Sequence, residues 1–506
     1  MSKYIITPET ISFSEIANKG FSLSAPQYKT LLIRNKIFLF VKDFLERNLS
    51  NNDLGTEVGS LNYIRKSHKY FLRTKALQSH TFLPELNAET TRQIQPKMFN
   101  QMDLKEGDLI ISKDSNIGEI IILDKDYPNH MLSSAMYRLP VIKETKYYLL
   151  AFIKHSIFRE QLDFIVPSGA TIRHAKTLFL DCKIPIPNQN KNKVMNYVSL
   201  LTQAIINKEK EIRKKHSLIF EMFDKELIEN QKQETFEYKF PTISQIESVG
   251  RIDTARYTEE YKSYEFLLSN YKNSTSTFTE RGYKVKRGQN LQVSNIGKSH
   301  YSDEYMDSFY KLIVSSNFSE YSTVEKYKYI GNSKKLKKIE VGEIVFSARG
   351  AQFGRVVILP EIANNIITNL DSLVFSSETA SLTESIFITL FLNRLRWNKH
   401  IYSIAITGSG ANSFTAYQID DINIPNYPVE KQREIVKQYY NPKSIDNTSK
   451  ATLINFLELD NAFNEEAGIY ELDKSAKALK ERLNEVIDQI ANDENIEITF
   501  NGIASA

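Results

Sequence analysis

Cysteine, tryptophan and long apolar runs are almost missing from this chain. Among its 506 residues there is one cysteine, Cys182, so no internal disulfide can form. The longest apolar runs, such as the one from Ile386 to Leu392, fall far below the roughly 20 residues that a membrane-spanning helix needs. The N-terminus lacks the basic segment, apolar run and cleavage site of a signal peptide. These absences predict a cytoplasmic protein that is not integral to a membrane.

A strong charge of either sign is also missing. Lys and Arg number 65 against 61 Asp and Glu, which leaves a formal net charge of +4. The overall charge therefore neither requires nor excludes a polyanionic partner, and charge has to be judged locally. The hydrophobic share of 41% and the charged share of 25% are those of an ordinary globular protein with enough apolar material for more than one core.

Recognisable enzyme motifs are absent as well. The stretch from Gln292 to Ser299 ends like a phosphate-binding loop, but Gln292 stands where the first glycine belongs. An adenine methyltransferase would grip an extruded base with an Asn-Pro-Pro-aromatic motif, and Asn441-Pro442-Lys443 stops after one proline. Eight scattered histidines and one cysteine give no paired spacing for a metal. We therefore expect a non-catalytic chain that binds no metal or cofactor itself.

One pattern occurs twice, with a spacing between the copies of roughly 230 to 240 residues. The stretch 107–123 returns at 342–359, and both copies predict a strand, a short polar loop and a second strand, with Gly118 and Gly354 at the turn. Downstream, each copy continues with a helical pattern, a Ser-Gly-Ala loop and an apolar strand that ends in Ile-Pro. The shared order of features predicts two homologous α/β domains.

Each predicted domain is followed by a segment without glycine whose apolar residues recur three and four positions apart, as in a helix that packs on another helix. The first seam covers 194–222, where Lys208 and Lys215 interrupt it, and the second covers 469–490. The predicted fold class is α/β (α+β), with two repeated domains separated by two long antiparallel coiled-coil helices and related by a pseudo-twofold axis. The predicted segments are a first domain, a central helical spacer, a second domain and a distal helical region, at 1–188, 189–235, 240–426 and 427–498.

The doubled strand-loop-strand units, Ile-Pro endings and long helices resemble the specificity subunit of type I restriction-modification systems over nearly the whole chain. Residues 430–435 look like the family's acidic-glutamine helix start, whereas 190–193 depart from it. The segment 441–466 is long for the family and has no assigned role.

This resemblance implies that each repeat is a target recognition domain that reads half of a split double-stranded DNA sequence. The helices would set the gap and dock two methyltransferase (modification) subunits. The chemistry would then belong to partners, which bind S-adenosylmethionine, and optionally to a restriction subunit that translocates DNA with ATP and magnesium. A coiled-coil scaffold with repeated protein-binding domains and no DNA role is the alternative function, and the salt dependence of binding to duplex DNA separates the two.

Two basic segments precede the repeated strand pairs and are candidates for contacts with DNA phosphates. The first, 65–75, has five Lys or Arg and no acid, and the second, 321–338, has six lysines and one acid. Either segment alone is also typical of a solvated charged face, but both recur at the same place in the repeat. The candidate residues are Arg65, Lys66, Lys69, Arg73, Lys334, Lys335, Lys337 and Lys338.

The loops of the two strand pairs are candidates for reading bases, since Arg pairs with guanine and Asn or Gln pairs with adenine. The Ser-Gly-Ala loops add further candidates, because small residues let a backbone approach a phosphate. In both cases the alternative interpretation is a polar turn that contacts only water. The candidate residues in these loops are Lys113, Asn116, Arg173, Arg349, Gln352 and Asn412.

Overall fold

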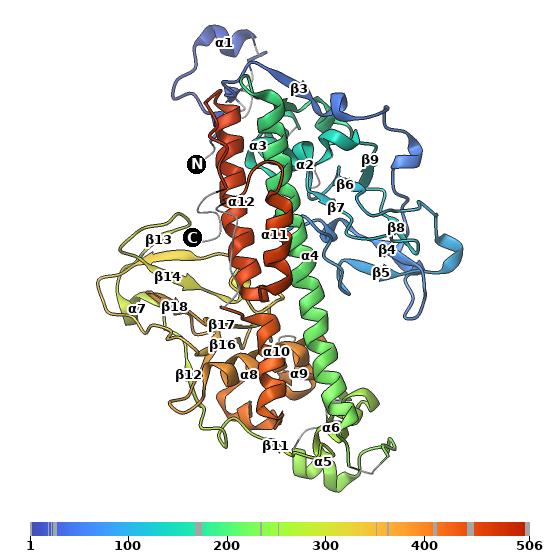
Figure 1. Cartoon of the computed structure of the whole chain (residues 1–506), viewed down its shortest axis with the longest axis vertical. Coiled ribbons are helices and arrows are strands. Elements are labelled where there is room, and N and C mark those ends of the chain that lie inside the picture. Colours follow the sequence, from blue (N-terminus) through green and yellow to red (C-terminus); the bar gives the residue numbers. More distant parts are fainter. Residues whose placement is uncertain are drawn as a thin grey trace. The chain divides into compact units, whose positions relative to one another are not determined.

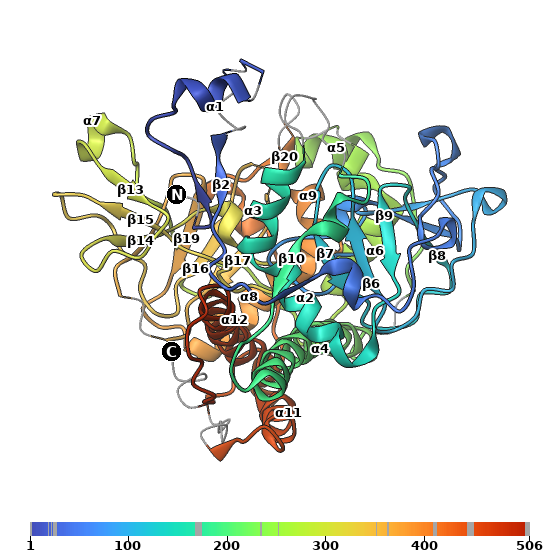
Figure 2. The same cartoon turned by 90° about the horizontal axis from the view of Figure 1, so that it is seen from above.

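The computed structural model describes residues 3–500 except 19, 22, 24–27, 167–174, 233–234, 251, 253, 351, 362–363, 408–411 and 443–449. The chain, shown in Figures 1 and 2, divides into two compact units. Unit 1 consists of 1–211, 444–466 and 472–506, and unit 2 consists of 212–443 and 467–471. No helix within the described ranges is long and apolar enough to cross a membrane.

Unit 1 combines short strands with helices. Two three-stranded sheets have the orders β7-β6-β9 and β5-β4-β8, and two further pairs join β1 to β2 and β3 to β10. The strands are β1 (Ile5–Ile6), β2 (Thr30–Leu31), β3 (Phe38–Phe40), β4 (Tyr70–Leu72), β5 (Thr91–Gln93), β6 (Leu109–Ser112), β7 (Ile120–Ile122), β8 (His130–Leu132), β9 (Met136–Leu139) and β10 (Lys183–Pro185). The helices are α1 (Phe13–Asn18), α2 (Lys146–Lys154), α3 (Ser156–Ile165), the first part of α4 (Lys191–Glu229), α11 (Phe456–Glu466) and most of α12 (Ile469–Ala491).

The strands β6 and β7 are buried along their whole length because both faces of their sheet are covered. Side chains alternate between the two faces of a strand. Leu109 and Ile111 accordingly join the main core with residues of α2 and α3, whereas Ile110 joins a second, smaller core. This explains why the sequence of the hairpin is apolar throughout and does not alternate with polar residues.

Unit 2 contains the corresponding elements. Its two four-stranded sheets have the orders β12-β19-β16-β17 and β13-β15-β14-β18. The strands are β11 (Thr275–Ser276), β12 (Lys284–Arg287), β13 (His300–Ser302), β14 (Tyr310–Ile313), β15 (Lys328–Gly331), β16 (Ile344–Ser347), β17 (Val356–Ile358), β18 (Ile366–Thr368), β19 (Ser372–Ser376), β20 (Ile406–Thr407), β21 (Asn412–Ser413) and β22 (Ile424–Pro425). The helices are the second part of α4, α5 (Ile243–Val249), α6 (Glu259–Ser269), α7 (Val293–Ile296), α8 (Leu382–Trp397), α9 (His400–Ile404) and α10 (Val429–Tyr439).

The repeat predicted from the sequence is present in both units. The hairpins β6-β7 and β16-β17 are antiparallel, and each is flanked by a second antiparallel neighbour, β9 or β19. Each unit also has one parallel pair, β4 with β8 and β14 with β18. Gly118 and Gly354 have φ values of 78° and 80°, in the left-handed region that favours glycine. The predicted α/β fold class with two repeated domains and a long helix is confirmed.

Within unit 1 the first part of α4 packs antiparallel on α12. Val198 and Ile205 of α4 share one core with Leu483 and Ile490 of α12. Asn35 Nδ2 donates hydrogen bonds to the carbonyl oxygens of both Ile186, just before α4, and Ile490, near the end of α12. Further along α4, Glu209 accepts a hydrogen bond of 2.7 Å from Nζ of Lys480, a residue that lies nearer the start of α12. The start of one helix therefore lies beside the end of the other (Figure 1).

The second part of α4 packs on a different helix. In unit 2 the ring of Phe223 lies 5.2 Å from that of Phe387 and 5.8 Å from that of Phe391, both on α8. The predicted antiparallel pairing of the two seams is therefore found for the first part of α4, whereas the second part packs on α8. The physical reason is length: α4 has 39 residues and α12 has 23, so the remaining apolar face is covered by aromatic residues of α8.

The interruption of the seam at Lys208 is compensated by α11. Lys208 is fully buried, and its Nζ lies 2.7 Å from Asp460 Oδ1 and donates to Asn464 Oδ1 at 2.7 Å. The same ammonium group lies 4.8 Å from the ring centroid of Phe463. A buried charge is tolerated when it is paired and hydrogen-bonded. Part of segment 441–466, for which the sequence analysis had no role, thus supplies the partners of a buried lysine.

Candidate nucleic-acid interface

In unit 2 the loop after β16 is held by hydrogen bonds around Ser347. Gly354 N–H donates to the Ser347 carbonyl at 2.9 Å, and Ser347 N–H donates to the Arg355 carbonyl at 2.7 Å. The Ser347 hydroxyl donates to the Arg349 carbonyl at a longer 3.4 Å. Ser347 is fully buried, whereas Arg349 is exposed. This set of bonds, the serine clasp, fixes the base of a loop whose tip faces solvent.

The same loop is joined to the loop that follows α9. Phe414 N–H donates to the Ala348 carbonyl at 2.9 Å, and Arg349 forms an antiparallel β-bridge with Ser413. Asn412, the neighbour of Ser413, lies in β21 and pairs with Thr407. The structure therefore brings together the backbones of two predicted base-reading segments that are about 60 residues apart in sequence.

Unit 1 repeats the serine clasp at Ser112. Gly118 N–H donates to the Ser112 carbonyl at 2.8 Å, and Ser112 N–H donates to the Glu119 carbonyl at 2.8 Å. The Ser112 hydroxyl donates to the Asp114 carbonyl at 2.7 Å. Ala175 N–H donates to the Lys113 carbonyl at 2.9 Å, which corresponds to the bond from Phe414 N–H to the Ala348 carbonyl in unit 2. Two loops of one chain are thus built on the same backbone framework.

The side chains on the two loops differ. Asp114 occupies the place that Arg349 has in unit 2, and it forms an ion pair with Lys113. Lys113 is 18% exposed, so this predicted base reader is already engaged by its neighbour. Asn116 is half-buried, and its carbonyl accepts from Glu119 N–H at 3.1 Å. Arg173 lies outside the described residues.

The serine clasps were missed in the sequence analysis, although the sequence contains a signal for them. Both copies of the repeat have a serine five positions after the first glycine, Ser112 after Gly107 and Ser347 after Gly342. A hydroxyl at the end of a buried strand can bond to the backbone of the following loop. Gln352, by contrast, was predicted as a base reader, and in the structure it is half-buried beside the turn.

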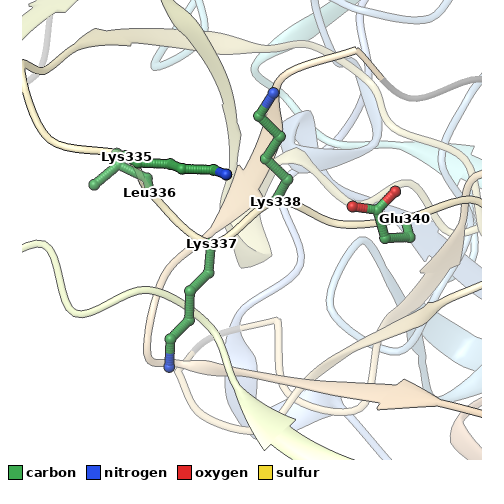
Figure 3. A pocket seen from close by; sticks show the side chains of 5 residues that line it. All are labelled: Lys335, Leu336, Lys337, Lys338 and Glu340. Atoms are coloured by element: carbon green, nitrogen blue, oxygen red, sulfur yellow. The ribbon is translucent and has the colours of Figure 1, made fainter.

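The lysines of the second basic segment line a pocket of about 530 Å³ on the surface of unit 2. Lys335, Lys337 and Lys338 surround the buried Leu336, and Glu340 completes the lining (Figure 3). The ends of Lys337 and Lys338 point in opposite directions (Figure 3). Two hydrogen bonds from backbone N–H groups to side chains hold the segment, from Leu336 to the Tyr310 hydroxyl at 3.2 Å and from Lys337 to Gln289 Oε1 at 3.1 Å.

The four candidate lysines of this segment are exposed. Lys334 Nζ donates to the Asn295 carbonyl at 3.1 Å. Within the part of the chain that the structure describes, none of the four ammonium groups forms an ion pair. The positive charges of Lys335, Lys337 and Lys338 are therefore available to an anionic ligand.

The cations of the first basic segment, in unit 1, fall into two groups, one exposed and one with partners in the local structure. Arg65 and Lys66 lie exposed in a bend. Lys69 Nζ donates to Asn129 Oδ1 at 3.0 Å and lies 4.1 Å from the ring centroid of Phe99, and Arg73 donates to the Glu89 carbonyl at 3.1 Å. Lys69 and Arg73 thus stabilise local structure, and Lys75 is exposed but lies 3.6 Å from Glu89, which leaves Arg65 and Lys66 as the exposed candidate residues.

A histidine beside this segment adds no charge at neutral pH. His130 of β8 stacks on Tyr70 of β4 with ring centroids 4.8 Å apart. Burial, and to a smaller extent repulsion from Lys125, lowers the pKa of His130 to about 4. Among the described residues there is no cluster of three or more His, Cys, Asp or Glu side chains that could hold a metal ion.

Residues 56–236 match the family model of the type I restriction modification DNA specificity domain. No curated protein matches the chain. Among solved structures, the chain is similar to the type I restriction-modification system S subunit from M. genitalium, with 11% identity over 92% of this chain and 99% of that chain and a TM-score of 0.39. The HsdS subunit from Thermoanaerobacter tengcongensis is 12% identical over 91% of this chain and 97% of that chain, with a TM-score of 0.26. At these TM-scores the structural likenesses add nothing to the family match.

Proposed function

We propose that the chain recognises a bipartite DNA target, in line with the match of residues 56–236 to the type I restriction modification DNA specificity domain. Each unit reads one half of the target. The exposed cations contact phosphates and so position the chain on the duplex, while the loop tips contact base edges. Phosphate contacts supply affinity without sequence information, and base contacts supply the sequence information.

The observation that carries this proposal is the pair of serine clasps. One chain contains the same loop framework twice, with Asp114, ion-paired with Lys113, in one loop and the exposed Arg349 at the tip of the other. An Arg side chain matches the two acceptors of guanine, and a carboxylate accepts from the amino group of cytosine. Equal frameworks that carry different side chains suit a reader of two different half-sites.

We assign no chemical step to this chain. The methyl transfer belongs to two methyltransferase subunits that bind S-adenosylmethionine, and DNA cleavage belongs to a separate restriction subunit where one is present. The long helices dock these partners and keep the two reading units apart. α4, with 39 residues, is about 58 Å long at 1.5 Å per residue, which is enough to span more than one turn of DNA.

The decisive experiment replaces residues 240–426 with the corresponding domain of a related specificity subunit and maps the methylated adenines in a host genome. Only one half of the bipartite motif is expected to change. A change of both halves, or a continuous motif, would show that the two-reader proposal is wrong. A purified chain that does not bind duplex DNA at any salt concentration would favour the protein-binding scaffold instead.

The spacer is tested by inserting four residues after Glu211, between the unit 1 and unit 2 parts of α4. Four residues add about 6 Å and roughly one helical turn, so the contacts of each part of α4 within its own unit are kept. The gap between the two half-sites is expected to grow by one or two base pairs with both half-sequences unchanged. An unchanged gap in a folded variant would contradict a helical ruler and favour a flexible connection.

A further inference from the structure

The residue that follows the glycine of each serine clasp is Glu119 in unit 1 and Arg355 in unit 2. The backbones of both residues make the same two bonds. The carbonyl accepts from the serine N–H, and the N–H group donates to a carbonyl within the loop, that of Asn116 or of Gln352, at 3.1 or 3.2 Å. The two residues thus share one position of the repeat, the loop foot, where one side chain is acidic and the other is basic.

In unit 1 the buried carboxylate of the loop foot is held by two cations. Arg159 of α3 donates to Glu119 Oε1, and Lys154 Nζ at the end of α2 lies 3.9 Å from Glu119 Oε2. A Cβ on the neighbouring Gly118 would lie 2.3 Å from Leu162 Cδ1 of α3. The loop foot and α3 are therefore in close contact, through both charge and packing.

In unit 2 the loop foot is a guanidinium group with 12% of its side chain exposed. Arg355 donates to the carboxylate of Glu320 and to the carbonyl of Phe318, both between β14 and β15. The same carboxylate accepts from Arg396 of α8, whose Nη2 lies 3.1 Å from Glu320 Oε1. Burial would raise the pKa of Glu320, but the bonds and charges of Arg396 and Arg355 lower it. An ionised Glu320 thus bridges two arginines that would otherwise repel each other.

The two arrangements match in position and are inverted in charge. Arg159 follows Glu119 by 40 positions, and Arg396 follows Arg355 by 41. In unit 1 the arginine of the helix pairs with the loop foot directly, and in unit 2 it pairs through a carboxylate from another segment. A mostly buried charge is costly unless it is paired. Each loop foot is therefore bound to a helix of its own unit.

We propose that Glu119 and Arg355 are positioning residues that fix the direction of the two loops proposed to read bases. The inference rests on the proposed function and adds the groups that hold each loop. The serine clasp fixes the backbone within the loop, whereas the side chain of the loop foot joins the loop to α3 or to α8. A hydrogen bond to a base edge requires close distance and alignment. A loop that turns on its helix therefore loses discrimination between bases while the phosphate contacts remain.

The test is made on the full chain by selection of bound sequences from a randomised duplex library. Glu119→Gln and Arg355→Gln each remove the charge of one loop foot. Each variant is expected to lose discrimination at one half-site by roughly fivefold, the lower end of what one base contact supplies, with the other half-site unchanged. The slope of log affinity against log salt concentration is expected to stay the same, since the phosphate contacts are kept.

Further variants separate the ion pair from the shape of the side chain. Glu119→Asp and Arg355→Lys keep the charge and are expected to select the same sequences as the unaltered chain. Arg159→Gln should reproduce the effect of Glu119→Gln. The two substitutions together should have no larger effect than either alone, because both break one ion pair.

Arg281→Gln is the matched control. Arg281 pairs with Glu384 of α8 at 2.9 Å, and its other partners, Pro425 and Asn426, lie outside the loop. Thermal unfolding is measured for every variant. The control is expected to lose stability without a change in the selected sequences.

Unchanged selection in both loop-foot Gln variants, with relaxed selection in Arg349→Ala, would overturn the inference and leave the proposed function intact. Equal broadening in Arg281→Gln would make the ion pairs purely structural and would also overturn it. If a loop-foot variant does not fold, Arg159→Gln in unit 1 and Arg396→Gln in unit 2 break the same contacts from the helix side and decide the question. An unaltered chain that selects no bipartite sequence would overturn both the inference and the proposed function.

Discussion

The loop of unit 1 and the loop of unit 2 share a backbone and differ at their tips. Ser112 and Ser347 make the same three kinds of bond, yet they present Asp114 in one loop and Arg349 in the other. The neighbouring basic segments differ too. Lys69 and Arg73 form hydrogen bonds within unit 1, whereas the four candidate lysines of segment 321–338 in unit 2 are exposed. The duplicated part of the molecule is thus the backbone framework, and the part that differs is the set of side chains on it.

The largest difference between the two units is expected in their stability against unfolding at acid pH. Burial lowers the pKa of His216 and of His400 in unit 2 to about 4, and in unit 1 it lowers the pKa of His130 to about 4. Between about pH 6.5 and about pH 4, the unfolded chain binds protons that the buried rings do not, so the free energy of unfolding falls as the pH falls.

Unit 2 is therefore expected to lose amide hydrogen-exchange protection at a higher pH than unit 1 when the pH is lowered from about 7 to about 4.5. The measurement is hydrogen exchange resolved by peptide, with the strands β6 and β16 as matched reporters. Earlier loss of protection in unit 1 would contradict this account of the buried histidines.

Removal of the exposed cations should weaken DNA binding more in unit 2 than in unit 1. Each phosphate contact contributes about 0.9 to the slope of log affinity against log salt concentration. Changing Lys334, Lys335, Lys337 and Lys338 to Ala is expected to reduce the slope by as much as three to four, and Arg65→Ala with Lys66→Ala by about two. Binding titrations over a series of salt concentrations measure this. An unaltered slope would remove the segment concerned from the interface.

The loop tips should control one half-site each. Arg349→Ala is expected to relax the choice at one base pair of one half-site, with a loss of about 1–3 kcal/mol of discrimination. Asp114→Ala is expected to act on the other half-site alone. Selection of bound sequences from a randomised duplex library measures both. The comparison of the loops fails if both substitutions change the same half-site.

The smallest effect is expected from the serine clasps. Ser347→Ala removes a hydrogen bond worth about 1 kcal/mol and loosens the loop that carries Arg349. Specificity should broaden in the half-site of unit 2, and Ser347→Thr should restore it. Ser112→Ala is the matched control, because it should broaden only the other half-site. An equal loss of stability with no change in the selected sequences would make both serines purely structural.

The large features of the fold could be predicted from the sequence because they are local or repeated. Glycine at 118 and 354 between β-branched runs predicts a hairpin, and the spacing of apolar residues from Val194 onward predicts a long helix. The predicted domain boundaries and DNA contacts stay predictions. The helices that pack on α4 could not be predicted from the sequence, because an apolar seam indicates that a face is buried but not which helix covers it.

The candidate site was predicted less completely than the fold. The basic segments were found from composition, but composition does not reveal that Lys69 is engaged by Asn129 and Phe99. The role of Lys208 was also hidden, because its acidic partner lies in a distant segment without a recognisable pattern. Contacts of this kind depend on three-dimensional packing, which neither charge nor periodicity describes.

The division of the chain into units has a consequence for the order of folding during synthesis. Unit 1 takes residues from both ends of the chain, whereas unit 2 needs little beyond residue 443. The charge of Lys208 is compensated only after Asn464, 256 residues later in the chain, has been synthesised. Domains generally fold as they leave the ribosome, so unit 2, although second in the sequence, can complete its core first. Unit 1 becomes complete only when α12 has been made.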